Sequence, residues 1–170
     1  MDDMTALHVT PIEREILNAC IWPESLSESL ALTINQRVLE DTLPFGAMRL
    51  LPFLLSVVPE VFVDDKAKSI ITSVQRHTHA RNLITLSMLG QSMAALETEG
   101  IQALALKGGA LIQTVYPSLN LRPTADGDLL IVSDHSRSEV QYALDKVGLR
   151  CVETSETTAK FLGAASAELD

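Results

Sequence analysis

Aromatic and basic side chains are both scarce in this sequence. Aromatic residues make up 4% of the 170 residues, with Trp22 as the single tryptophan. This excludes an aromatic platform on which single-stranded nucleic acid or a sugar could stack. Only 13 Lys and Arg stand against 22 Asp and Glu, and the net charge is −9. That balance argues against nucleic acid or anionic lipid as a partner and favours an acidic site that binds a cation.

Cysteines are few, and we expect neither a leader segment nor a membrane-spanning apolar run. The two cysteines, Cys20 and Cys151, lie far apart, which argues against a disulfide framework or a cysteine-based metal site. The acidic start of the chain lacks the basic and apolar regions of a signal peptide. The most apolar stretch, residues 50–63, is shorter than the roughly 20 residues of a membrane span. We therefore expect a cytoplasmic protein with no membrane partner.

The apolar residues that are present predict a helical first half. At 46% apolar content the chain can build its own core. Apolar residues recur at steps of three and four up to residue 63, and prolines fall at the expected starts and breaks. One such stripe consists of Ile12, Ile16, Ala19 and Cys20. A longer helical pattern then runs from about residue 64 to 99 and ends at Gly100.

The second half changes character after Gly100. Residues 101–106 form a short apolar run that predicts a strand buried on both faces. Residues 110–116 predict a helix, 117–124 a loop, 126–134 a strand, 137–148 a helix and 149–153 a third strand. The predicted fold is α/β (α+β), with a short mixed sheet behind an N-terminal helical region. We divide it into residues 1–63, a core of 64–154 and an unplaced tail of 155–170.

Two carboxylates at the second predicted strand carry the clearest chemical signal. Asp126 and Asp128 are two residues apart, so on a strand their side chains point to the same face. Mg²⁺ or Mn²⁺ carrying a substrate phosphate would neutralise their repulsion. The alternative is a simple Asp-Gly-Asp turn. The apolar residues 129–132 that follow favour the metal site.

A second signal lies between the first predicted strand and its helix. Gly108 and Gly109 follow Lys107 there, and without a Cβ their backbone N–H groups can approach a phosphate at the positive end of a helix. The alternative is a tight strand-to-helix turn with no ligand. The spacing fits neither a Walker A loop nor a dinucleotide-binding fingerprint.

Taken together, these segments resemble the uncharacterised bacterial nucleotidyltransferase family of the polymerase β nucleotidyltransferase superfamily. The resemblance covers about residues 80–150 and includes an LKG stretch, a Tyr-Pro, an Arg-Pro and a D-x-D followed by an apolar run. The matching positions are Leu106, Lys107, Gly108, Ala110, Leu111, Tyr116, Pro117, Arg122, Pro123, Asp126 and Asp128.

The resemblance implies transfer of a nucleoside monophosphate from a nucleoside triphosphate to an acceptor hydroxyl, with pyrophosphate leaving. Asp126 and Asp128 would then be catalytic and hold Mg²⁺ or Mn²⁺. The triphosphate would contact Gly108 and Gly109, with Lys107 and Arg122 as further phosphate ligands. Arg81 is a further candidate for a phosphate contact. The acceptor, a small molecule or a protein, is not specified by any motif.

Two positions depart from the family pattern. Gly127 separates the two acids, where the family usually has an apolar residue, and the third carboxylate of the superfamily has no clear match. Glu153, in the third predicted strand, is the candidate substitute. The alternative function is therefore a catalytically incomplete module of the same fold that binds a nucleotide or another protein. A nucleotide-sugar glycosyltransferase could use the same D-x-D, but the short chain and the glycine pair argue against it.

Overall fold

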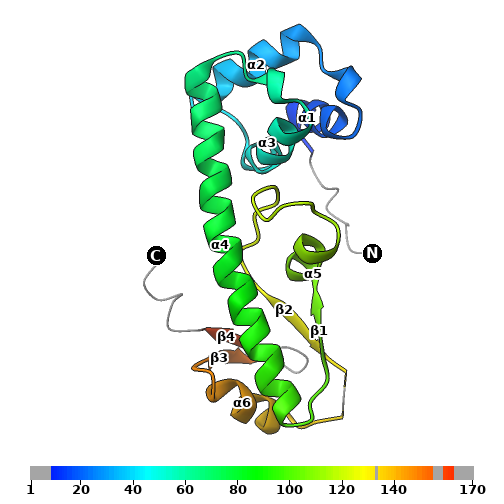
Figure 1. Ribbon diagram of the computed structural model, residues 1–170, viewed down its shortest axis with the longest axis vertical. Helices are drawn as coiled ribbons and strands as arrows, with labels where there is room; N and C mark the ends of the chain where they lie inside the picture. The colour runs from blue at the N-terminus through cyan, green and yellow to red at the C-terminus, as the bar shows by residue number, and fades with distance from the viewer. Residues whose placement is uncertain (1–8, 133, 155–158, 163–170) are drawn as a thin grey trace, which may run out of the picture. The chain divides into compact units, whose positions relative to one another are not determined.

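The computed structural model describes residues 9–132, 134–154 and 159–162, with side chains as far as Cys151. Figure 1 labels the helices and strands of these residues in chain order. They are α1 (Pro11–Ile21), α2 (Glu28–Leu39), α3 (Phe45–Val57), α4 (Asp65–Thr98), β1 (Ala103–Leu106), α5 (Lys107–Thr114), β2 (Asp128–Ile131), α6 (Arg137–Asp145), β3 (Arg150–Thr154) and β4 (Ala159–Leu162).

The chain forms two compact units. The first unit consists of residues 1–80 and the loop 116–123, and the second consists of residues 81–115 and 124–170. Helix α4 is continuous, so its first half belongs to the first unit and its second half to the second. The division into residues 1–63, 64–154 and 155–170 drawn from the sequence stays a prediction.

Local capping explains where the helices of the first unit begin. Thr10 and Glu13 form a capping box at the start of α1, and Pro11 takes a position where its missing N–H costs no hydrogen bond. Ser27 caps α2 by accepting from the N–H of Leu30. The short helices expected in this region are therefore confirmed.

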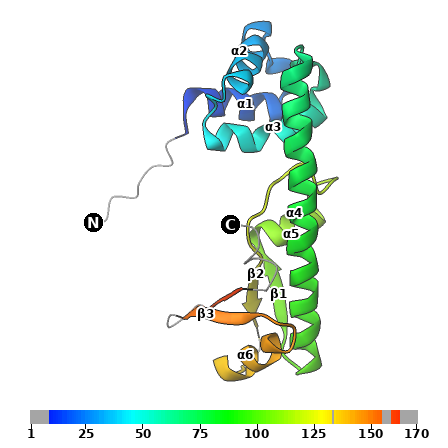
Figure 2. The same cartoon turned by 90° about the vertical axis from the view of Figure 1, so that its left-hand side faces the viewer.

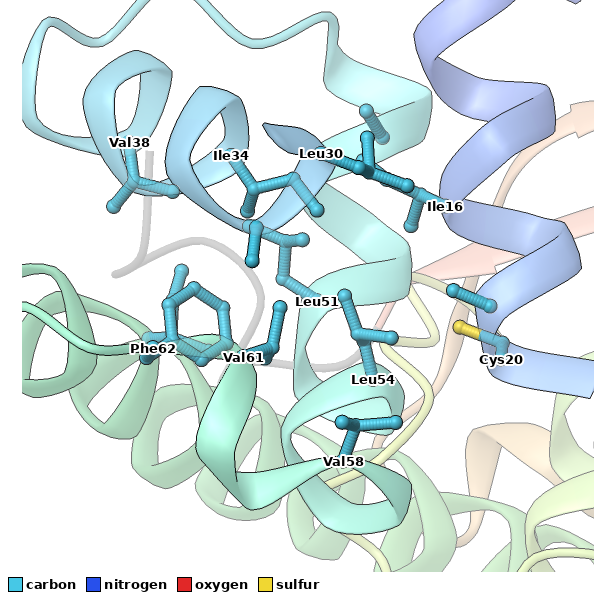
Figure 3. Close-up of a cluster of buried hydrophobic side chains, with 14 of the residues drawn as sticks. Ile16, Cys20, Leu30, Ile34, Val38, Leu51, Leu54, Val58, Val61 and Phe62 are labelled. Carbon is cyan, nitrogen blue, oxygen red and sulfur yellow. The ribbon is translucent and has the colours of Figure 1, made fainter. Parts of the chain in front are cut away.

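The core of the first unit is built from α1, α2, α3 and the beginning of α4. The predicted stripe of α1 is confirmed, since all four of its residues are buried. Figure 3 shows side chains from α1, α2 and α3 turned toward one another. Buried Asn35 adds a polar tie, because its amide donates to the carbonyl of Val61 and accepts from the N–H of Asp64. The largest fully buried side chains here are Ile16, Ile34, Leu51, Leu54, Val61 and Ile71.

The second unit packs the end of α4 and helix α6 against one face of a small sheet. Strands β1 and β2 run beside α4 in both views (Figures 1 and 2). Ala103, Leu129 and Ile131 face the buried cluster. Gly100 and Gly148 adopt φ values of 75° and 78°, left-handed conformations that let the chain turn after α4 and α6. The buried cluster consists of Leu96, Ile101, Ala143, Leu144 and Leu149.

The sheets differ from the expected mixed sheet. In the described residues, β1 pairs antiparallel with β2, and β3 pairs antiparallel with β4 in a separate sheet. The predicted alternation of strands and helices is confirmed, but a shared sheet is wrong. Strand β4 lies in the tail that the sequence pattern did not place. Within the described residues, no helix is long and apolar enough to cross a membrane.

Strand β1 is also less buried than its apolar sequence predicted. Its residues alternate between half-buried and exposed, and Leu104 remains 54% exposed. Leu104 is paired with Leu130 of β2, which is 46% exposed. Burial on both faces was therefore wrong, because an antiparallel pair can cover one face only and leave the other open.

Candidate functional site

The central feature of the site is an ion pair between Lys107 and Asp128. Nζ of Lys107 donates a hydrogen bond of 2.8 Å to Oδ1 of Asp128. Antiparallel register puts Leu106, the last residue of β1, opposite Asp128, the first residue of β2. Lys107 is the next residue after Leu106, so the pairing of the two strands places it beside Asp128.

Both acids of the D-x-D raise the pKa of Lys107 and so favour its charged form. The hydrogen bond to Asp128 raises the pKa of Lys107 most, followed by the negative charge of Asp128 and then that of Asp126. The Lys107 side chain is 72% exposed and that of Asp128 is 27% exposed. Solvent therefore screens the pair, and it contributes little to stability.

Lys107 has an unusual backbone conformation. Its φ of 46° is left-handed, a region that costs a residue with a Cβ about 1–2 kcal/mol. The helix was expected to begin near residue 110, but α5 begins at Lys107, directly after the strand. Gly108 and Gly109 consequently lie in the first turn of this helix and are buried. No side chain caps that turn at Leu106, so its backbone N–H groups have no side-chain acceptor there.

Leu89 of α4 connects the glycine turn with the D-x-D. A Cβ on Gly109 would lie 2.5 Å from Cδ1 of Leu89, and a Cβ on Gly127 would lie 2.7 Å from its Cγ and Cδ2. The Leu89 side chain, 5% exposed, thus fills the space above both glycines. This explains why Gly127 takes a place where an apolar residue was expected, because a larger side chain would collide with Leu89.

Asp126 and Asp128 differ in their surroundings. Asp128 opens strand β2, whereas Asp126 precedes the strand and is exposed. The expectation that both acids lie within the strand was therefore wrong by two residues. Upstream of them, Oδ1 of the fully buried Asn82 accepts a 3.1 Å hydrogen bond from the N–H of Thr124, which fixes the backbone two residues before Asp126.

The contributions of Asn82 and Leu89 to this region become visible only in the tertiary structure. Both lie on α4. An Asn inside the long helical pattern was the one available signal for Asn82, because Asn is disfavoured in a helix interior unless its side chain has a partner. Its neighbour Arg81 was chosen instead. Arg81 is exposed, and its phosphate contact stays a prediction.

The segment with the Tyr-Pro and Arg-Pro pairs belongs to the first unit. Phe53 of α3 meets Tyr116 edge to face, with ring centres 6.0 Å apart. Arg49 of α3 donates a 3.2 Å hydrogen bond to the carbonyl of Pro123. These contacts hold the loop 116–123 on α3. Arg122 is half-buried in this loop, and its role as a nucleotide ligand stays a prediction.

The carboxylates of Asp126 and Asp128 suit a hard cation that is also bound by phosphate oxygens and waters. Within the residues that the structure describes, no group of three or more His, Cys, Asp or Glu side chains is placed to hold a metal. Mg²⁺ and Mn²⁺ are commonly held by one or two carboxylates together with substrate phosphates and waters. Asp126 and Asp128 fit that requirement. The side chain of Glu153, the candidate third carboxylate in β3, lies outside the described part.

Comparisons with known proteins identify the family. No curated protein and no solved structure matches the chain. Residues 47–165, well over half of the chain, match the family described as uncharacterised nucleotidyltransferase. The matched region runs from α3 to beyond β4 and contains the Lys107–Asp128 pair, both glycines under Leu89 and the loop held on α3. The chain therefore belongs to the uncharacterised nucleotidyltransferase family.

Proposed function

We propose that the protein transfers a nucleoside monophosphate from a nucleoside triphosphate, bound with Mg²⁺ or Mn²⁺, to an acceptor hydroxyl. The observation that carries the proposal is the convergence of the acid pair, Lys107 and the first turn of α5 at the junction of β1 and β2. A divalent cation bound there would neutralise the phosphate charge that develops during transfer.

The residues of the junction have separate tasks in this reaction. Asp126 and Asp128 supply the oxygen ligands for the cation. The uncapped N–H groups around Gly108 and Gly109 face anionic oxygens of the triphosphate, which the positive end of a helix favours. Lys107 contributes a mobile positive charge. Arg122 belongs to the loop of the first unit and stays a separate candidate for a phosphate contact, with a planar fork suited to two phosphate oxygens.

The transfer itself forms one bond and breaks one. The acceptor oxygen bonds to the α-phosphorus, and the bond from this phosphorus to the oxygen bridging to the β-phosphate breaks, so that pyrophosphate leaves. The proton of the acceptor hydroxyl passes to a general base, for which Glu153 is the candidate. A cytoplasmic location goes with this proposal, since nucleoside triphosphates are its substrates.

A second function is favoured by the acidic side chains that the structure describes. Among the described residues, no third acidic side chain joins Asp126 and Asp128. A chain without a general base would bind the metal and nucleotide but would not release pyrophosphate. The alternative is therefore a nucleotide-binding or protein-interaction module of the same fold.

Calorimetric titration separates these possibilities. The full chain is titrated with ATP, GTP, CTP and UTP, with and without Mg²⁺ or Mn²⁺, and so is the Asp126→Ala, Asp128→Ala variant. We expect binding that requires the cation and is lost in this variant. Glu99→Gln is the matched control, because Glu99 also pairs with a lysine of the second unit, Lys146, but lies outside the D-x-D.

The outcomes lead to different conclusions. Absence of nucleotide binding by the folded wild-type chain contradicts the transferase and the nucleotide-binding module, and it leaves the protein-interaction module. Binding together with pyrophosphate release on addition of an acceptor supports the transferase, and binding without release in an acceptor screen supports the module.

A further inference from the structure

We propose that Lys107 is a resident counter-ion of the metal site, so that the site accepts the cation and the triphosphate together and discriminates against the free cation. In the structure Lys107 pairs with Asp128 and neutralises its charge. When the metal–triphosphate complex binds, Lys107 leaves Asp128 and pairs with a phosphate oxygen. This inference rests on the proposed function, because it assumes that Asp128 is a metal ligand.

The geometry of the pair makes Lys107 and a metal ion competitors. Nζ of Lys107 is 2.8 Å from Oδ1 of Asp128. Mg²⁺ binds a carboxylate oxygen at about 2.0–2.1 Å. A dication at that distance would lie close to the ammonium group, and two positive charges on one carboxylate repel each other. The free cation must therefore displace the lysine before it gains full use of Asp128.

The backbone holds Lys107 and Asp128 next to each other. Strand register puts Leu106 opposite Asp128, and the left-handed turn at Lys107 follows at once, with a φ of 46°. Gly108 and Gly109 after it are buried, and Gly109 lies against Leu89 of α4, which restricts this turn. The lysine is therefore held beside Asp128 by the fold, while its exposed side chain remains free to rotate.

Charge explains why the nucleotide removes the competition. Asp126 and Asp128 together carry two negative charges, of which Lys107 neutralises one. A triphosphate brings several more negative charges to the same place, at the positive end of α5. Lys107 can then exchange a carboxylate partner for a phosphate partner without losing an ion pair, and the cation meets both carboxylates unopposed.

Lys146 offers a matched control within the same unit. Its Nζ donates to Oε1 of Glu99 at 2.6 Å, so it too is an exposed lysine paired with a carboxylate. It follows the end of α6 with an ordinary φ of −62° and takes no part in the D-x-D.

The test measures binding of Mn²⁺ alone, by electron paramagnetic resonance, to the full-length wild-type chain and to the Lys107→Met, Lys107→Arg and Lys146→Met variants. We expect Lys107→Met to bind Mn²⁺ about fivefold more tightly than the wild type, as removal of one exposed ion-pair competitor predicts. Lys107→Arg keeps the charge and should bind Mn²⁺ like the wild type, and Lys146→Met should also be unchanged.

A second titration uses Mn²⁺ with inorganic tripolyphosphate, which needs no base recognition. Here the order should reverse, with Lys107→Met binding the complex more weakly than the wild type because it lacks the phosphate partner. Circular dichroism of each variant establishes that the chains compared are folded.

The failures of the two proposals are distinguishable. Equal Mn²⁺ affinity of the wild type and Lys107→Met overturns the counter-ion role and leaves the proposed function standing. Unchanged affinity of Lys107→Met for the tripolyphosphate complex overturns the transfer of Lys107 to phosphate, and with it the inference. If none of the folded chains binds Mn²⁺, the inference and the metal-dependent function are both contradicted.

Discussion

Leu89 of α4 occupies the space that a Cβ on Gly127 would need. A Cβ at position 127 would lie 2.7 Å from both Cγ and Cδ2 of Leu89, closer than nonbonded carbon atoms come. A residue on the long helix thereby determines which residue can separate the two acids of the D-x-D.

Gly127→Ala should therefore destabilise the second unit. Leu89 is buried and cannot move aside freely, so we expect a loss of about 1–3 kcal/mol of unfolding free energy, as for other overpacked sites. Chemical denaturation measures this loss. In a Leu89→Ala background the added methyl has room, and the cost of Gly127→Ala should largely disappear.

Gly90 supplies the control for this prediction. It lies next to Leu89 in α4, but a Cβ there would meet nothing within 4 Å. Gly90→Ala should stabilise the helix by about 0.5–1 kcal/mol, because alanine has the better helix propensity. A Gly127→Ala variant as stable as the wild type would contradict the role assigned to Leu89.

Asn82→Ala should weaken Mn²⁺ binding as well as stability. The variant leaves the N–H of the buried Thr124 without its acceptor, which costs about 1–3 kcal/mol, and it releases the backbone leading to Asp126. Calorimetric Mn²⁺ titration, at a temperature where the variant is folded, measures the effect on the site.

Asn35→Ala separates a positioning role from simple destabilisation. Asn35 is likewise buried and ties backbone groups together, but in the first unit. It should lower stability by a comparable amount and leave Mn²⁺ affinity unchanged. If both variants affect Mn²⁺ binding equally, Asn82 has no specific role at the D-x-D.

The thiol of Cys20 should resist alkylation near neutral pH. Burial raises its pKa to about 11, and only the thiolate reacts. Mass spectrometry after iodoacetamide treatment at pH 8 should find Cys20 unmodified in the folded chain and modified after denaturation. Rapid modification of Cys20 in the folded chain would contradict the core position of α1.

The same shift predicts how stability depends on alkaline pH. The folded chain holds the Cys20 proton up to a pKa of about 11, above the ordinary value of 9.0 in the unfolded chain. The contribution to stability is therefore complete below pH 9 and is lost as the pH rises toward 11. Cys20→Ala should remove this part of the pH dependence in thermal melts.

The capping residue Glu13 predicts that the stability of the folded chain falls at acidic pH. Hydrogen bonds from the backbone and hydroxyl of Thr10 lower the pKa of Glu13 below 4.5. The stabilisation is present above pH 4.5 and is lost as the pH falls through the lower pKa of the folded chain. Glu13→Gln should therefore be less stable than the wild type at pH 7, and thermal melts should show this difference shrinking in acid. A difference independent of pH would contradict a charge-dependent cap.

The sequence determined the local structure of this protein and supplied the two carboxylates of the D-x-D on which the proposed function rests. Apolar spacing predicted the buried stripe of α1, because a helix repeats every 3.6 residues whatever surrounds it. Gly100 predicted the end of α4, because few other residues adopt its left-handed conformation. The segments from Lys107 to Asp128 also indicated the family that residues 47–165 match.

Tertiary structure decided what spacing along the chain cannot specify. The antiparallel register that brings Lys107 to Asp128 and the exposure of Leu104 depend on which strands pair, and the pairing partners are 20 or more residues apart. The roles of Leu89 and Asn82 depend on which side of α4 meets the glycine turn and the loop before Asp126. Such contacts join residues distant in sequence, so packing alone selects them.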